Sequence, residues 1–138
     1  MQAASPARLY ATVVGAVLTI AGIIGFFYSS DFGSPGTVDD VFGLLDVNGW
    51  HNVFHLVTGL LGLAAAGYFA RTYALALGLL YAVLAVWGFI IGSGDSILGF
   101  IPINTEDNVL HLVLGVLGLA AGAASPAAKR QVRSPAAA

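Results

Sequence analysis

The sequence of 138 residues is 58% hydrophobic and only 9% charged, with a formal net charge of −2 and no cysteine. Its mean hydropathy is +0.88. A soluble domain carries about 25% charged residues, so the composition excludes an ordinary soluble globule. The lack of cysteine excludes a small secreted fold held by disulfides. An integral membrane protein is indicated.

Four apolar segments predict membrane-spanning helices, at residues 9–29, 53–70, 72–94 and 109–124. A helix crosses the hydrocarbon layer in about 20 residues, and backbone groups must be paired within lipid. The first segment is longer than a usual signal-peptide core and lacks a small-residue cleavage site, so we expect a retained helix. The tails, residues 1–8 and 125–138, are short and of low complexity and are predicted to be disordered. Residues 1–138 thus form a single predicted transmembrane domain.

The charged residues sort by segment. All five basic residues lie in the two tails and the connection between the second and third spans. All seven acidic residues lie in the other two connections. By the positive-inside rule, both termini are cytoplasmic in a multi-pass protein of the cell (plasma) membrane, expected to be a bacterial inner membrane. The bilayer is the expected partner, and the few basic residues do not indicate nucleic-acid binding.

An internal repeat divides the chain in two. The fourteen residues from Asn52 recur, with few changes, from Asn108 onward, and Gly25-Phe26 aligns with Gly88-Phe89 in the preceding spans. The repeat predicts two tandem helical hairpins, at about 9–70 and 72–124, related by a pseudo-two-fold axis along the membrane normal. The expected fold is an all-α integral membrane four-helix bundle.

The repeated pattern resembles a bacterial family of small four-helix membrane proteins known only as domain of unknown function 4383. The pattern reads Gly43, Val47, Asn48, Asn52, His55, Leu56, Gly59 in the first copy and Gly99, Ile103, Asn104, Asn108, His111, Leu112, Gly115 in the second. This resemblance covers most of the chain apart from the tails. It implies the four-helix fold and brings no established activity.

Both copies place polar and small residues on one helical stripe. The stripe residues are Asn48, Asn52, His55, Gly59 and Gly62, and Asn104, Asn108, His111, Gly115 and Gly118. Small residues at this spacing let helices approach closely in lipid. The second and fourth helices therefore meet along the stripe, or each packs it on its hairpin partner. Asn48 and Asn104 precede the helical segments, where N-caps are expected.

The histidines allow a sharper alternative. His51 and His55 are four residues apart on one helix face, and Asp107 and His111 stand at the equivalent positions. If the pseudo-symmetry brings these faces together, the four side chains are candidate ligands of a divalent transition metal near the outer membrane surface. A second option is a haem held between His55 and His111.

Function is less specified than fold. We found no catalytic motif, so no enzyme activity is expected. The apolar outer loops, Val41–Leu45 and Ile97–Ile101, are expected to fold over the outer end of the bundle. The leading expectation is a structural or accessory membrane protein without a cofactor, self-associating or bound to other membrane subunits. The metal- or haem-binding protein is the alternative.

Overall fold

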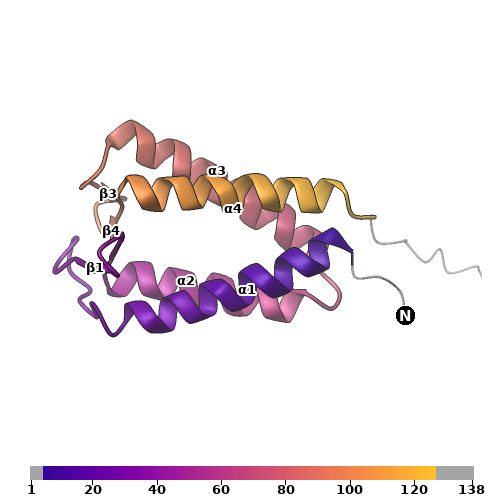
Figure 1. The fold of residues 1–138 in the computed structure, drawn as a ribbon, viewed down its shortest axis with the longest axis horizontal. Helices are drawn as coiled ribbons and strands as arrows, with labels where there is room; N and C mark the ends of the chain where they lie inside the picture. Colours follow the sequence, from indigo (N-terminus) through magenta and orange to yellow (C-terminus); the bar gives the residue numbers. More distant parts are fainter. Residues whose placement is uncertain (1–4, 127–138) are drawn as a thin grey trace, which may run out of the picture.

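The computed structural model describes residues 5–126, which form four long helices and two short β-hairpins (Figure 1). The helices are α1 (Pro6–Gly25), α2 (Gly49–Ala65), α3 (Ala70–Ile91) and α4 (Thr105–Ala123). Strands β1 (Asp39–Val41) and β2 (Leu45–Val47) pair between α1 and α2, and β3 (Ser96–Ile97) and β4 (Ile101–Pro102) pair between α3 and α4. The chain is mostly helical, as predicted, but the strands were not expected.

The helix boundaries differ from those predicted by hydropathy. Helices α2 and α4 each begin four residues before the predicted spans, because the caps at Asn48 and Asn104, rather than the first apolar residue, start them. Helix α1 begins within the predicted N-terminal tail, since Ser5 caps it and Pro6 occupies its first turn. The disorder predicted for residues 1–4 and 127–138 lies outside the described part of the chain.

The helices pack in two pairs, α1 with α2 and α3 with α4 (Figure 1). The pairs meet through a core supplied by α1 and α3, which includes Tyr10, Leu18, Leu77 and the fully buried Tyr81. Large apolar side chains on the outward faces of all four helices remain exposed. Within the described residues, α1, α3 and α4 are long and apolar enough to cross a membrane, whereas α2 has 17 residues.

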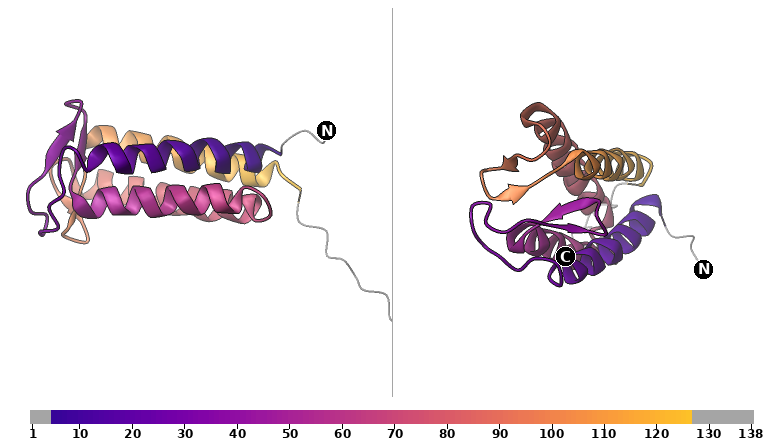
Figure 2. Two further views of the ribbon diagram at one scale, coloured as in Figure 1. Left: turned by 90° about the horizontal axis from the view of Figure 1, so that it is seen from below. Right: turned by 60° about the vertical axis from the view of Figure 1, so that its left-hand side comes forward.

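Both hairpins lie at one end of the bundle, opposite the start of α1 and the end of α4 (Figure 2). Their three-residue turns share a conformation, with Phe42 and Leu98 at φ +55° and Gly43 and Gly99 at φ +71° and +78°. The buried strand residues Val41, Val47 and Ile97 face inward. The hairpins therefore cover the ends of the helices, as expected for the outer loops.

Within residues 5–126, seven hydrogen bonds made by side chains cross between the pairs, and four of them fall at positions that the predicted sequence repeat aligns. The Tyr10 hydroxyl donates to the Leu114 carbonyl (2.8 Å), and the Tyr73 hydroxyl donates to the Thr58 carbonyl (2.9 Å). At the hairpin end, the Asn48 amide donates to the Phe100 carbonyl (2.6 Å) and the Asn104 amide to the Leu44 carbonyl (2.8 Å). Each helix pair thus holds a backbone carbonyl of the other.

Candidate functional site

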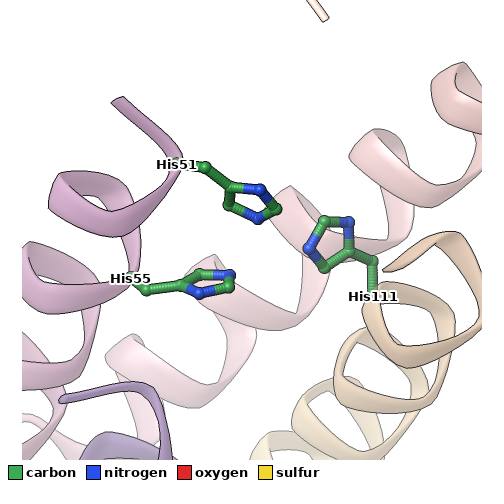
Figure 3. A group of neighbouring side chains, drawn as sticks. All are labelled: His51, His55 and His111. Carbon is green, nitrogen blue, oxygen red and sulfur yellow. The ribbon is translucent and has the colours of Figure 1, made fainter. Parts of the chain in front are cut away.

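Three histidines, two from α2 and one from α4, point toward one another (Figure 3). Each of His51, His55 and His111 offers a ring nitrogen, and these three atoms all lie within 4.8 Å of one another. The ring centroids are 4.4 Å apart for His51–His55, 5.9 Å for His51–His111 and 6.2 Å for His55–His111. His51 and His111 are buried and His55 is partly buried. They are the only histidines in the chain.

Local sequence places these rings in the first turns of two helices. The Asn48 side chain accepts a hydrogen bond from the His51 backbone N–H at 2.9 Å, which starts α2 one residue after Asn48. His51 and His55 are then one helical turn apart and share a face. Asn104 starts α4 in the same way, so His111 occurs in its second turn. Two capped helices therefore present their imidazoles to one point.

A backbone carbonyl fixes the tautomer of His51. Its Nδ1 lies 2.7 Å from the Asp46 carbonyl oxygen. A carbonyl only accepts hydrogen bonds, so Nδ1 carries the proton and Nε2 keeps its lone pair. That Nε2 is buried without a hydrogen-bond partner, and so is Nδ1 of His111. Buried polar atoms normally have hydrogen-bond partners. Two ring nitrogens without such partners in one cluster are what a metal site without its ion would contain.

Asp107, a predicted fourth ligand, is not a member of this cluster. Its carboxylate accepts backbone N–H groups from Asn104 (3.2 Å) and from Asp46 (3.1 Å). The first of these bonds, with the Asn104 side chain accepting from the Asp107 N–H, completes a capping box. The predicted repeat aligns position 107 with His51, but the two side chains make different contacts: the His51 imidazole belongs to the cluster, and the Asp107 carboxylate joins α4 to the first hairpin.

The surroundings of the cluster are acidic and partly desolvated. Burial raises the pKa of the Asp46 carboxyl to about 6, and the hydrogen bond and charge of Asp40 add to this, while the Asn104 amide opposes it. The Asn104 amide donates to Asp46 Oδ1 at 2.9 Å. All seven acidic residues belong to the hairpin segments and the first turn of α4. This charge favours cations near the cluster.

The arrangement suits a small ion better than a haem. Imidazole is a good ligand for zinc, copper and nickel. A tetrahedral ion bound about 2.0–2.1 Å from each nitrogen would need the rings to draw together by roughly 1 Å. A haem iron would fit between the His55 and His111 rings, whose centroids are 6.2 Å apart, but the macrocycle would need the space in which the His51 ring lies. Three imidazoles leave the fourth tetrahedral position open.

The remaining motif residues lie at helix contacts. A Cβ at Gly59 would meet Thr19 and the Gly15 carbonyl of α1, and a Cβ at Gly115 would meet the α3 backbone. At Gly62 and Gly118, a Cβ would first meet a tyrosine of the other helix pair, Tyr73 and Tyr10 respectively, and then the backbone of the hairpin partner. Of the two predicted arrangements, each helix therefore packs its stripe on its hairpin partner. Asn52 and Asn108 are buried, and their amides fill the space that the missing side chains of Gly25 and Gly88 leave.

Tyr81 belongs to the neighbourhood of the site but was not singled out from the sequence as part of it. Its ring is fully buried and its centroid lies 4.9 Å from that of His111. The repeat carries the only available signal, because Leu18 stands at the aligned position. The two copies thus differ at this site twice, at His51 with Asp107 and at Tyr81 with Leu18.

The chain matches the family model described as "Domain of unknown function (DUF4383)" over residues 8–124. No curated protein and no solved structure matches it. Because the matched region covers most of the chain, including the helices that carry the histidines, the protein belongs to this family.

Proposed function

We propose that the chain is an integral protein of the cell membrane with four spans and cytoplasmic termini. Three helices of sufficient length and hydropathy support this, and α2, with 17 residues, is at the lower limit for a span. The exposed apolar faces fit lipid contact. Arg8 and Arg71 lie at the end opposite the hairpins, and the acids at the hairpin end, in agreement with the positive-inside rule.

We also propose that the bundle is a duplicated helical hairpin with pseudo-two-fold symmetry. The paired crossing hydrogen bonds support this, because Tyr10–Leu114 and Tyr73–Thr58 correspond under the sequence repeat. Asn48–Phe100 and Asn104–Leu44 correspond in the same way. Symmetry of this kind would by itself place His55 and His111 opposite each other.

We infer that the protein binds a divalent transition-metal ion on the outer side of the membrane through His51, His55 and His111. The convergence of three imidazole nitrogens within 4.8 Å carries this proposal. Burying His51 Nε2 and His111 Nδ1 without hydrogen-bond partners is costly for a purely structural bundle. An ion bound to the lone pairs would remove that cost, and the Asp46 carbonyl holds His51 as outer partners hold metal-bound histidines.

Metal analysis of the purified chain tests the proposal. Protein in detergent, with any affinity tag removed, is dialysed against Zn²⁺ or Co²⁺ and its metal content is measured. We expect one ion per chain in the wild type and in the control Asp95→Asn, whose side chain accepts a hydrogen bond from the Ser96 backbone N–H and is not part of the histidine cluster. His51→Ala, His55→Ala and His111→Ala should each weaken binding at least about 100-fold, since loss of an outer partner alone costs 10–100-fold.

Two results would overturn the metal proposal. One is a metal-free wild-type protein, or binding that survives all three histidine substitutions; the protein would then fit the structural or accessory component of a membrane complex expected from its sequence. The other is a Soret band in the absorption spectrum that disappears in His55→Ala and His111→Ala, which would support haem instead.

A further inference from the structure

An apolar groove adjoins the histidine cluster. It has a volume of about 270 Å³ and lies between one face of α1, the first hairpin and α2. Its walls include Ile24 of α1, Phe42 at the hairpin turn and Val47 of β2, and its one ionisable lining residue is His55. Phe42 is 73% exposed, and its ring lies edge-to-face with that of Tyr28, with centroids 5.9 Å apart. A groove of this kind, apolar with one polar anchor, is typical of a small-molecule site.

His55 differs from His51 in its outer hydrogen bonding. The second nitrogen of a metal-bound histidine nearly always donates to a carbonyl, a carboxylate or water. Asp46 fills that place for His51. Among residues 5–126, the hydrogen bonds at His55 involve its backbone and not its ring. With one nitrogen directed to the cluster, the ring has an N–H available for an acceptor in the groove.

The lining of the groove restricts which kind of molecule could supply that acceptor. The groove lining contains no lysine or arginine that could hold an anionic headgroup. A neutral molecule is therefore favoured. The volume accommodates one ring with a short substituent, and the exposed Phe42 provides an aromatic edge or face for it. Because the groove lies on an apolar face at the proposed outer end of the spans, a neutral molecule would enter it from the lipid.

We propose that this groove binds the head ring of a membrane-soluble quinone, whose carbonyl oxygen accepts a hydrogen bond from His55. This proposal adds a ligand to the proposed histidine site and rests on the proposed membrane location of the protein. Binding of the ring would place a carbonyl one imidazole away from the proposed metal. The occupant would thereby serve as the outer partner that orients His55, which is the role Asp46 has for His51.

The repeat itself supplies a variant that fills the groove. Trp87 precedes Gly88 as Ile24 precedes Gly25, so the second copy already carries an indole at the position equivalent to Ile24. Ile24→Trp therefore introduces a side chain that this fold accommodates elsewhere. Ile23→Trp is the matched control, because Ile23 is 49% exposed and does not line the groove.

The experiment is a titration of detergent-solubilised protein, metal-free and Zn²⁺-loaded, with decylubiquinone, followed by quenching of intrinsic tryptophan fluorescence and by thermal shift. We expect saturable binding to the wild type and to Ile23→Trp, and at least a tenfold loss of affinity in Ile24→Trp. His55→Phe keeps a ring but removes the N–H, so affinity should fall about 2–10-fold. The ligand-induced thermal shift, taken relative to the ligand-free Tm of each variant, does not depend on the fluorescence of the added indole.

The opposite results would overturn the proposal: no saturable binding, equal binding by Ile24→Trp and Ile23→Trp, or unchanged affinity in His55→Phe. A short-chain lipid, dioctanoyl phosphatidylcholine, serves as competitor, and displacement of the quinone at equal concentration would assign the groove to acyl esters instead. Metal content is measured on the same samples. Quinone binding to a protein that takes up no metal would refute the metal site alone, and metal binding without quinone binding would refute the groove alone.

Discussion

Replacing Gly59 by alanine should destabilise the bundle at its closest helix contact. A Cβ built at Gly59 would overlap the Thr19 backbone nitrogen and lie 2.5 Å from Thr19 Oγ1 and 2.8 Å from the Gly15 carbonyl oxygen. Non-bonded heavy atoms prefer a separation of about 3.5–4.0 Å, so α1 and α2 must move apart by roughly 1 Å. The nearest obstacles are backbone atoms, which cannot rotate away.

The expected cost follows from two opposing effects. Overpacking a tight contact typically costs about 1–3 kcal/mol, and alanine regains up to ~1 kcal/mol of helix propensity over glycine. We expect a net loss of about 1–2 kcal/mol, or roughly 3–8 °C in Tm, in thermal unfolding monitored by circular dichroism in detergent. Gly67→Ala is the control, since nothing lies within 4 Å of its Cβ. An unchanged Tm for Gly59→Ala, or an equal loss in both variants, would refute close packing along the stripe.

Three further predictions concern the contacts between the two helix pairs. Tyr10→Phe and Tyr73→Phe each remove one crossing hydrogen bond and should lower the free energy of unfolding by similar amounts, about 1 kcal/mol each; a large difference between them would contradict equivalent roles. Asn48→Ala removes an N-cap and two amide donations and should cost about 2–3 kcal/mol and expose the hairpin end to limited proteolysis, whereas unchanged cleavage would argue against this role. The pKa of Asp46 is raised to about 6 in the folded chain, so folding favours the protonated form of this carboxyl. Protonation of Asp46 therefore stabilises the fold fully below about pH 4, and this stabilisation is lost as the pH rises through 6. Asp46→Asn should flatten the pH dependence of Tm over that range. The corresponding change in the free energy of unfolding is less than about 1 kcal/mol, because Asp46 is partly exposed, and an unchanged profile would exclude this carboxyl as the source of the pH dependence.

The helical architecture was predictable because long apolar segments bounded by charged or polar residues are a strong signal for helices in a sequence. The caps at Asn48 and Asn104 were also readable from the sequence, and the structure places them at the starts of α2 and α4. Hydropathy alone set the boundaries of these helices four residues late, because the polar first turns belong to the helices. The β-hairpins were not predictable in this way, because their strands are only two or three residues long and are too short to show an alternating pattern.

The site was predicted in part. The positions of His51 and His55 on one helix face, together with the repeat that relates His55 to His111, pointed to a cluster of imidazoles. The sequence could not separate Asp107 from this group, since its spacing to His111 equals that of His51 to His55. Only the three-dimensional contact with the Asp46 backbone N–H shows that its carboxylate is engaged in holding α4 and the first hairpin together.

X-ray absorption spectroscopy of the Zn²⁺-loaded chain tests the central claim most directly, because it counts the ligands of the ion. The proposed site predicts three imidazole nitrogens at about 2.0–2.1 Å, with the multiple-scattering pattern of histidine rings, and one further light atom. A spectrum with one imidazole or none, or one dominated by carboxylate oxygen, would contradict the assignment of His51, His55 and His111 to a single ion.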